Sequence, residues 1–391
     1  MQEIVDRFAA SDRGAEIART LLLPYLNHAA TMYASEYATR DDIDAAMRFG
    51  CGYPIGPLAL IDALGADVVV SGLEKLYAET GDPLHQPAPV LSDLSAAGAP
   101  DDAAEPAMRH EIETVGVVGT GTMAAGIIEV FAKAGLDVVF VGRSDEKVDG
   151  VIATITKNLD KAIAKDKLDE AGKEAVLGRL TGATSREALS DVDIVVEAIA
   201  EDMDVKLELF TDLDRIVKPG AILATTTSSL SISELAGATS RPDDVVGIHF
   251  FNPAPVMKLV EVVSAPTTSP DVAETAKALS ARVGKHPVSC TDRAGFIVNA
   301  LLFPYLNDAV KLYEAGDDSL EEIDTAMKEA KLPMGPFELL DVVGNDVSLA
   351  IEQTLVGAFG HSGWEPAPTL VRLVEEGKLG RKTGEGFHTY R

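Results

Sequence analysis

Residues 114–126 read T-V-G-V-V-G-T-G-T-M-A-A-G, a short β-branched run that ends in a glycine-rich turn. A segment with helical apolar periodicity follows as far as Ala134, and Asp137–Val141 has the composition of a second strand. The order strand, glycine turn, helix, strand is typical of a dinucleotide-binding α/β unit. The sequence therefore predicts a Rossmann-type doubly wound sheet.

The glycines of this turn have distinct predicted roles. Gly119 permits the tight turn, and Gly121 lets the backbone approach a pyrophosphate held at the helix amino terminus. We therefore expect a nicotinamide dinucleotide to bind at Gly119, Gly121, Thr122 and Met123. A glycine turn without a ligand is the alternative.

The end of the second strand bears on which dinucleotide binds. A fold of this kind that takes NAD usually has an acidic residue here, whose carboxylate binds the ribose hydroxyls. The strand ends instead in Val141-Gly142-Arg143-Ser144, where an arginine and a hydroxyl suit a 2′-phosphate. We therefore expect Arg143 and Ser144 to favour NADP over NAD. The alternative is a solvent-facing Arg143, with Asp145 or Glu146 in place of the missing acid.

Further strands are expected at Asp193–Glu197, Ile222–Thr226 and Val245–Ile248. A helical excursion from Glu146 to about Leu180 interrupts the alternation of strands and helices. In sheets of this type, the ligand crevice lies at the carboxyl ends of the parallel strands. The glycine turn is therefore expected to share one crevice with Glu201, Ser228 and His249.

A histidine and a glutamate stand in two nearby apolar runs. His249 ends the run that begins at Val245, and Glu261 lies within M-K-L-V-E-V-V. A carboxylate in such a run is expected to be buried, and a buried charge needs a partner. A carboxylate bonded to one imidazole nitrogen fixes the tautomer and raises the basicity of the other, which suits a general base. A core histidine, with Glu261 exposed at a sheet edge, is the alternative.

The overall composition limits the classes of partner. The 391 residues carry a formal net charge of −28, which argues against a nucleic acid or an anionic membrane surface. Cys51 and Cys290 form neither a metal-binding nor a redox motif and predict reduced thiols in a cytoplasmic protein. No segment has the character of a membrane span or a signal peptide.

In so acidic a chain, a polyanionic substrate needs a local group of basic residues. Lys157, Lys161 and Lys165 recur every four residues, on one face of a predicted helix, and Lys167 follows. These four residues, the lysine cluster, are a candidate site for such a substrate. A solvated helix face, with Asp160 and Asp166 as counter-charges, is the alternative.

About ninety residues occur twice in the chain. D-R-G-A-E-I-A-R-T-L-L-L-P-Y-L-N-H-A from Asp12 returns as D-R-A-G-F-I-V-N-A-L-L-F-P-Y-L-N-D-A from Asp292, and the match continues to P-A-P at 87–89 and 366–368. Helical periodicity and capping signals, such as Thr39 before Ile43, indicate two copies of one all-α domain. The first copy has Arg19 where the second has Asn299, which suggests a degenerate packing partner.

The predicted organisation is a degenerate all-α copy at 1–98, a linker at 99–111, a dinucleotide-binding domain at 112–292 and the second all-α copy at 293–391. We expect the two copies to pack as an internal pseudo-dimer that supports one active site per chain, either alone or within a homodimer.

As an ordered set, the motifs resemble those of the 3-hydroxyacyl-CoA dehydrogenases from Glu113 to Arg391. The resemblance rests on G-T-G-T-M-A-A-G, V-V-E-A-I-A-E, T-S-S-L-S-I, H-F-F-N-P-A-P-V-M-K-L-V-E-V, G-K-H-P-V-S-C-T-D-R-A-G-F-I-V-N, M-G-P-F-E-L-L-D and G-R-K-T-G-E-G-F. It implies an acyl-CoA substrate, a nicotinamide cofactor and a place in fatty acid metabolism such as β-oxidation.

The resemblance also implies roles for matching residues. His249 would be the catalytic acid and base, oriented by Glu261, and the reacting oxygen would bond to Ser228 and Asn299. Other positions match family contacts to CoA, at Asn158 and Lys165, and to the nicotinamide nucleotide, at Glu201, Lys206, Ser228, Asn252 and Lys382. The chain departs from the family at Gly142, where an aspartate is common, and in its extra amino-terminal copy. A further departure is A-K-L-P-M-G-P at Ala330–Pro336, which is one residue shorter than the G-C-G-Y-P-I-G-P of the first copy.

We therefore expect an (S)-3-hydroxyacyl-CoA dehydrogenase for short acyl chains, such as the pair 3-hydroxybutyryl-CoA and acetoacetyl-CoA. A dehydrogenase of free hydroxy acids on the same scaffold is one alternative, and it should not need the lysine cluster. A non-catalytic assembly protein that uses the repeated helical domain is another.

Overall fold

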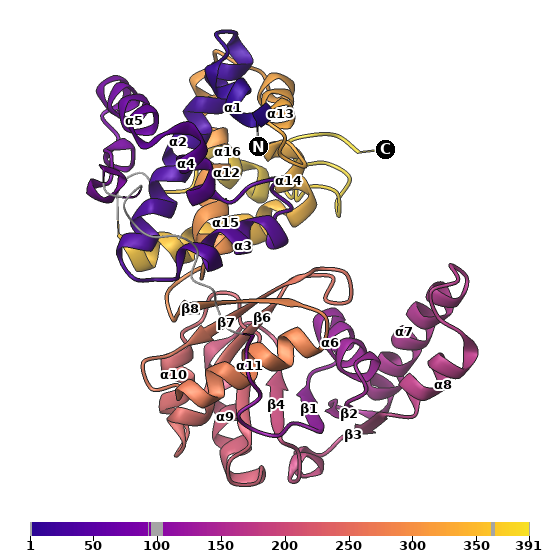
Figure 1. Cartoon of the computed structure of the whole chain (residues 1–391). Helices are drawn as coiled ribbons and strands as arrows, with labels where there is room; N and C mark the ends of the chain where they lie inside the picture. Colours follow the sequence, from indigo (N-terminus) through magenta and orange to yellow (C-terminus); the bar gives the residue numbers. More distant parts are fainter. Residues whose placement is uncertain (1, 93, 95–104, 361–363, 391) are drawn as a thin grey trace. The chain divides into compact units, whose positions relative to one another are not determined.

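The computed structural model describes residues 2–92, 94, 105–360 and 364–390 (Figure 1). The chain divides into two compact units, Ala103–Arg293 and Met1–Asp102 with Ala294–Arg391. The first is built on a β-sheet, and the second is helical. Within the described ranges, no helix is both long enough and apolar enough to cross a bilayer.

The unit Ala103–Arg293 contains an eight-stranded sheet with the order β3-β2-β1-β4-β5-β6-β7-β8. Neighbouring strands are parallel, except that β6 and β7 are antiparallel. The direction of winding reverses beside β1, as in a doubly wound dinucleotide fold. The predicted fold class is confirmed. The strands are β1 (Thr114–Val118), β2 (Asp137–Val141), β3 (Leu180–Ala183), β4 (Ile194–Glu197), β5 (Ile222–Thr225), β6 (Val245–Phe250), β7 (Leu259–Ser264) and β8 (His286–Thr291).

Helices cover both faces of this sheet (Figure 1). One face forms a common apolar core with α6, α7 and α11, to which Val117, Val196 and Ile248 contribute. The other face meets α10, since a Cβ on Gly247 would lie 3.0 Å from Ile232. Burial on both faces explains the near-continuous apolar strands. The helices are α6 (Thr122–Lys133), α7 (Asp145–Ile163), α8 (Glu170–Leu177), α9 (Met203–Ile216), α10 (Ile232–Gly237) and α11 (Pro270–Arg282).

Three features of this unit differ from the sequence expectation. α7 ends at Ile163, so Lys165 and Lys167 lie in the turn that follows, where Asp166 has φ 53°. The excursion ends in an additional strand, β3, whose four residues L-T-G-A are too short to show a period. Residues 105–111 of the linker have no regular element and bond to α11, for example from Ala107 N to Glu274 Oε1 at 2.9 Å. Residues 99–104 lie outside the described residues.

The helical unit contains the repeat. Equivalent helices are α2 and α12, α3 and α13, α4 and α14, and α5 and α15, with α1 before the first copy and α16 near the end of the second. Their bounds are α1 (Gln2–Ala9), α2 (Arg13–Ala34), α3 (Arg40–Gly50), α4 (Pro57–Leu64), α5 (Ala66–Thr80), α12 (Val298–Ala315), α13 (Leu320–Glu329), α14 (Pro336–Val343), α15 (Asn345–Phe359) and α16 (Pro368–Glu375). The cap predicted at Thr39 is confirmed, because its side chain accepts from Asp42 N.

Equivalent residues make equivalent contacts in the two copies. The amide of Asn27 donates to Gln86 O at 2.8 Å and accepts from Ala88 N at 2.8 Å. Asn307, its counterpart on α12, donates to Glu365 O at 2.9 Å and accepts from Ala367 N at 2.8 Å. A buried asparagine therefore ties the same P-A-P segment to the long helix in both copies.

The two copies pack against each other through α2, which contacts α12 and α13. Arg13 at the start of α2 pairs with Asp318, just before α13, at 2.6 Å. Conversely, the hydroxyl of Tyr37, just before α3, donates to Phe296 O, just before α12, at 2.7 Å. Because the start of each long helix contacts the inter-helix loop of the other copy, the packing has the reciprocity of a two-fold interface.

The two copies differ at residues 19 and 299. Arg19 donates to the carbonyls of Phe8 and Ala10 at 2.6 and 2.7 Å, and so holds the end of α1 against α2. In the second copy, α12 begins at Val298, although its counterpart α2 begins at Arg13, the residue equivalent to Arg293. The later start follows from Phe296, whose φ of 47° lies outside the right-handed helical region. Asn299 is thus the second residue of α12 and is 8% exposed.

Glu352 on α15 is a buried carboxylate at a position where the first copy has Leu73. It is 2% exposed, and among the described residues neither of its oxygens has a hydrogen-bond partner. Desolvation raises the pKa of Glu352 to about 8, although Lys311 opposes the shift. Between about pH 4.5 and 8, the carboxyl group of Glu352 therefore stays protonated in the folded state, whereas in the unfolded chain, where its pKa is about 4.5, it loses the proton. Stability from this group is full below about pH 4.5 and is lost as the pH rises through 8.

Glu352→Leu is expected to stabilise the protein by on the order of 3 kcal/mol near pH 9 and by much less near pH 5, because the cost of the buried charge is present only at high pH. Urea unfolding at both pH values measures the difference. Glu74→Leu, at an exposed position on α5, is the control and should change stability by about 0.5 kcal/mol or less. Equal stability of the Glu352→Leu variant and the parent near pH 9 would contradict the buried, unpaired carboxylate.

Candidate active site

The turn after β1 brings two backbone segments into contact. Gly119 has φ 136°, and a Cβ there would lie 2.3 Å from Ala198 O, just after β4. Gly121 caps α6, and nothing lies within 4 Å of the place its Cβ would take. Gly119 is thus required for packing, whereas Gly121 leaves space at a helix amino terminus, where a pyrophosphate fits.

A pocket of about 700 Å³ opens at this turn. Residues that follow the carboxyl ends of β1 to β4 line it, which is the place where such sheets bind ligands. They include Gly119, Gly121, Thr122, Met123, Gly142, Arg143, Thr184, Arg186 and Ala198. One pocket thus brings together five of the predicted cofactor residues, and its open helix terminus fits a dinucleotide.

The chain leaves β2 through Gly142, Arg143 and Ser144. Arg143 is exposed and lines the pocket. Ser144 is the N-cap of α7, and its hydroxyl accepts from Lys147 N at 3.4 Å. Ser144 therefore has a local structural role as well as the predicted one, while Asp145 and Glu146 form the exposed first turn of α7.

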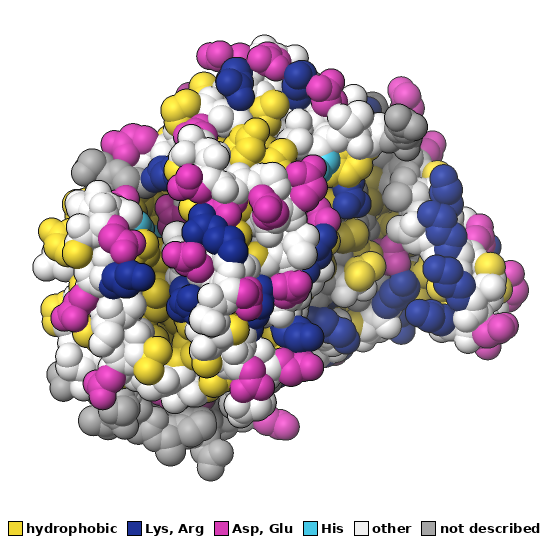
Figure 2. Space-filling model, turned by 90° about the horizontal axis from the view of Figure 1, so that it is seen from above, with side chains coloured by type: hydrophobic (Ala, Val, Ile, Leu, Met, Phe, Trp, Pro, Cys, Tyr) yellow, Lys and Arg dark blue, Asp and Glu magenta, His cyan; other side chains and the backbone are white. Residues whose placement is uncertain are grey.

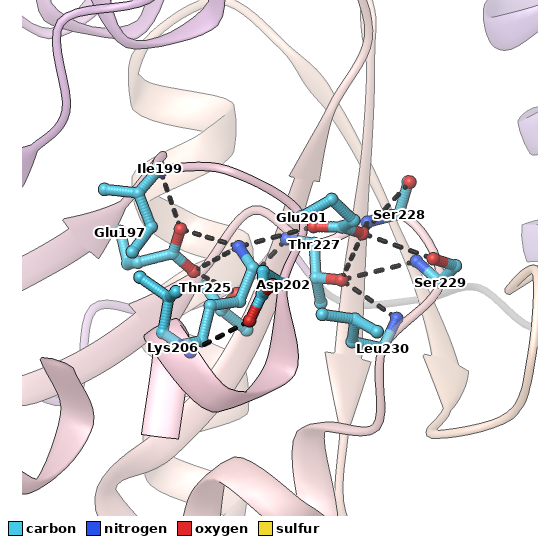
Figure 3. A network of polar contacts seen from close by, with 11 residues as sticks. Glu197, Ile199, Glu201, Asp202, Lys206, Thr225, Thr227, Ser228, Ser229 and Leu230 are labelled. Carbon is cyan, nitrogen blue, oxygen red and sulfur yellow. Dashed lines mark hydrogen bonds and ion pairs between the residues drawn. The ribbon is translucent and has the colours of Figure 1, made fainter. Parts of the chain in front are cut away.

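A buried lysine joins two carboxylates at the carboxyl end of β4 (Figure 3). Lys206 donates to both oxygens of Glu197, at 2.6 and 2.7 Å, and lies 3.3 Å from Glu201 Oε2. Glu197 also accepts from Ile199 N and from the hydroxyl of Thr225. Because Lys206 is 0% exposed and bonded to both oxygens of Glu197, its main role in the folded chain is to hold the two carboxylates together. The cofactor contact that the resemblance implied for Lys206 stays a prediction.

Glu201 in turn holds the loop that follows β5 (Figure 3). Its Oε1 accepts from Thr227 Oγ1 at 2.6 Å, from Ser228 N at 2.8 Å and from Ser228 Oγ at 3.2 Å. Burial alone would raise the pKa of Glu201, but the charge of Lys206 and these hydrogen bonds outweigh it and keep the pKa below its ordinary value. The ionised Glu201 therefore fixes Ser228 at the carboxyl end of β5.

His249 and Glu261 are direct cross-strand partners on β6 and β7. Nδ1 of His249 lies 2.7 Å from Glu261 Oε2, and the two side chains are 9% and 0% exposed. An ionised carboxylate can only accept, so Nδ1 carries the hydrogen and Nε2 is the basic nitrogen. The geometry is that of an oriented acid–base pair, and Glu261 is not an exposed edge residue.

Two protein-family models match the chain. Residues 114–293 match the NAD binding domain of 3-hydroxyacyl-CoA dehydrogenase, and residues 17–106 and 295–390 match its C-terminal domain. The chain belongs to the 3-hydroxyacyl-CoA dehydrogenase family. The double match confirms that this family's helical domain is present twice.

Relatives cover most of the chain. The 3-hydroxybutyryl-CoA dehydrogenase of Clostridioides difficile is 45% identical over 275 residues, which are 70% of this chain and 98% of that protein. Human mitochondrial hydroxyacyl-coenzyme A dehydrogenase is 46% identical over 301 residues, 72% of this chain and 92% of that protein. The crystal structure of (S)-3-hydroxybutyryl-CoA dehydrogenase from Ralstonia eutropha has a TM-score of 0.71 at 42% identity, and covers 72% of this chain and 100% of that one.

The dehydrogenase residues predicted to contact CoA lie on or just after α7. Lys165 is exposed in the turn after this helix, whereas Asn158 donates to Oε2 of the buried Glu129 on α6 at 2.9 Å. All four residues of the lysine cluster are exposed, and Figure 2 shows Lys and Arg side chains in a line along the arm formed by α7 and α8. In the described part of the chain, no carboxylate forms an ion pair with them. The alternative in which Asp160 and Asp166 neutralise the lysine cluster therefore has no ion pair in its support.

The loop after β6 carries Asn252, which is exposed and precedes Pro253 through a cis peptide bond. Lys285 fixes this loop, because its ammonium donates to the carbonyls of Ala254 and Met257 at 2.5 and 2.8 Å. Lys285 was not predicted from the sequence, although it lies in the G-K-H-P part of a recognised motif.

Two of the predicted site residues belong to the helical unit. Asn299 lies at the start of α12, and Lys382 has its ammonium 2.5 Å from Asp346 Oδ1 at the start of α15. Their roles at the substrate and cofactor stay predictions.

Proposed function

We propose that the chain interconverts (S)-3-hydroxyacyl-CoA and 3-oxoacyl-CoA of short chain length, such as 3-hydroxybutyryl-CoA and acetoacetyl-CoA. The observation that carries this proposal is the buried His249–Glu261 pair, on the same sheet whose strands β1 to β4 end at the dinucleotide pocket. Relatives named 3-hydroxybutyryl-CoA dehydrogenase support the substrate class. When bound, the nicotinamide cofactor supplies or accepts the hydride.

The protein's own part in the reaction is to hold and move a proton. In oxidation, Nε2 of His249 takes the proton of the substrate hydroxyl, while Nδ1–H stays bonded to Glu261. The carboxylate keeps the ring oriented and stabilises the imidazolium that forms. In reduction, the imidazolium returns the proton to the same oxygen.

Two further residues are assigned to the reacting oxygen. Ser228 is held by the bond from its backbone N to Glu201 Oε1 at 2.8 Å, and its hydroxyl would turn from Glu201 Oε1, 3.2 Å away, to donate to the reacting oxygen. Asn299 of the helical unit offers an amide. Preorganised donors of this kind stabilise the negative charge that develops on the oxygen.

The cofactor proposed for this site is NADP. Gly142 leaves no carboxylate at the end of β2 to repel a 2′-phosphate, and Arg143 lines the pocket beside it. The family model describes an NAD binding domain, so the nicotinamide part is common to both choices. Comparison of kcat/KM for NADPH and NADH with acetoacetyl-CoA tests the choice. A preference for NADH of about tenfold or more would contradict it.

The lysine cluster is proposed to bind the phosphates of CoA. The double substitution Lys161→Glu and Lys165→Glu is expected to raise the KM for acetoacetyl-CoA about tenfold, because four units of charge change beside a polyanion. The effect should shrink when salt is added, since the side chains are exposed. Lys75→Glu on α5 makes one charge reversal elsewhere and serves as the control.

The same double variant separates this function from that of a free hydroxy-acid dehydrogenase. An enzyme for free acids would show an unchanged KM and would turn over acetoacetate as fast as its CoA thioester. A non-catalytic assembly protein would oxidise neither NADPH nor NADH when acetoacetyl-CoA is added.

One active site per chain is proposed, because the repeat duplicates the helical domain, whereas the nucleotide-binding domain is matched once. The enzyme is proposed to be cytoplasmic, because Cys51 and Cys290 are free thiols. Titration calorimetry with NADPH is expected to give one cofactor per chain. A stoichiometry of two would contradict this organisation.

A further inference from the structure

The pocket extends past the end of β2 to the edge strand β3. The two strands pair in register as far as Val141 and Ala183, and Gly142 N donates to Ala183 O at 3.0 Å. By this register Gly142 lies opposite Thr184 where the two strands end, and Arg143 is the next residue after Gly142. Arg143 and Thr184 both line the pocket, and so does Arg186, two residues after Thr184.

Arg186 is held in place by a contact within the same unit. Its Nη1 donates to Oδ2 of Asp212 on α9. The side chain is 35% exposed, so the guanidinium is anchored at one nitrogen while it lines the pocket. A guanidinium fork has five donors, and a single contact through Nη1 leaves donors for a second anion.

The charges around Arg186 are mixed. Asp212 is shared with Arg215, at 3.6 Å, and Glu187 accepts from the hydroxyl of Ser185. As far as the structure describes the chain, the pocket lining includes Arg143 and Arg186 and no carboxylate residue. A doubly charged anion in this part of the pocket thus meets two guanidinium groups.

Packing at Gly142 also favours a cofactor that carries a 2′-phosphate. A Cβ at this position would lie 2.8 Å from Thr120 Cγ2 and 3.0 Å from Val148 Cγ2, so a side chain there would force its neighbours to shift. The ribose-binding carboxylate of an NAD-type site is absent because residue 142 is glycine, and the first carbon of any side chain there would press on Thr120 and Val148.

From these contacts we infer that Arg186 is a second specificity-determining residue, which with Arg143 clamps the 2′-phosphate of NADP. The inference rests on the proposed NADP preference and adds a residue from the edge strand to it. Thr184, which lines the same pocket, offers a hydroxyl to the same phosphate.

The test compares adenosine 2′,5′-bisphosphate with 5′-AMP, which differ only in the 2′-phosphate, by titration calorimetry on the full chain. The parent protein is expected to bind the bisphosphate at least tenfold more tightly. Arg186→Gln should reduce this ratio about tenfold. Arg186→Lys should give an intermediate ratio, because it keeps the charge and loses the fork. The ratio of the KM values for NADPH and NADH should rise in parallel.

Arg179→Gln is the matched control. Arg179 directly precedes β3, whereas Arg186 follows this strand, and it pairs with Asp137 at 3.0 Å. A parent protein that does not distinguish the two nucleotides would overturn the NADP preference, and the clamp with it. A parent that distinguishes them and an Arg186→Gln variant with the same ratio would overturn the role of Arg186 alone. Both Arg186 variants are compared with the parent by the ratio of the dissociation constants for 5′-AMP and adenosine 2′,5′-bisphosphate. A loss of affinity that is common to both nucleotides leaves this ratio unchanged and is therefore not mistaken for the effect.

Discussion

Replacement of His249 by glutamine is expected to lower kcat for acetoacetyl-CoA reduction about a thousandfold, because the site then has no group that donates and recovers a proton. Glutamine keeps a polar side chain opposite Glu261 on β7, so the strand pairing of β6 is expected to survive. The rate of cofactor oxidation under saturating substrate measures the loss.

Two controls separate this effect from general damage. His286→Gln changes an exposed histidine on β8, the strand that pairs with β7, and should leave the rate within about twofold of the parent. Binding of 5′-AMP reports whether the dinucleotide pocket of the His249→Gln variant is intact. A variant at His249 with an intact pocket and more than about a tenth of the parental kcat would show that another group transfers the proton.

Replacement of Lys206 by methionine is expected to have the largest effect on stability. The substitution leaves Glu197, which is 0% exposed, and the partly buried Glu201 without their shared cation. Removal of one partner from a buried ion pair typically costs about 3–5 kcal/mol, because an uncompensated charge stays in the interior. The urea concentration at the unfolding midpoint measures this cost.

A second substitution tests the cause. The double variant Glu197→Gln with Lys206→Met removes the orphaned charge and is expected to recover at least half of the lost stability, since the glutamine oxygen can still accept from Ile199 N. Lys218→Met is the control: its pair with Asp193, at 2.6 Å, lies at the surface and should contribute about 1 kcal/mol or less. A single Lys206 variant as stable as the parent would contradict the buried network.

Much of the fold follows from local patterns in the sequence. β1 and β2 have the predicted bounds, because β-branched runs end at glycine residues that only a turn requires. The repeat predicts two helical copies, and Asn27 and Asn307 then make the same contacts in each. The pairing of His249 with Glu261 is also predictable, since a carboxylate within an apolar strand needs a partner.

Other features depend on contacts that no local pattern contains. Phe296, with φ 47°, delays the start of α12, although the sequence around it is apolar and helix-like. The resemblance names Lys206 as a nucleotide contact, and only its spatial position between two carboxylates shows that it is buried. Arg186 follows a strand too short to recognise, so its place in the same pocket as Arg143 emerges only from the pairing of β2 with β3.

The His249–Glu261 pair is proposed to serve the reduction of a 3-oxoacyl-CoA by a nicotinamide cofactor. The most direct measurement is the absorbance of NADPH, and in parallel of NADH, after acetoacetyl-CoA is added to the full chain. We expect a substrate-dependent loss of reduced cofactor that is faster with NADPH and disappears in the His249→Gln variant. No loss with either cofactor, or an equal loss in the variant, would contradict this proposal.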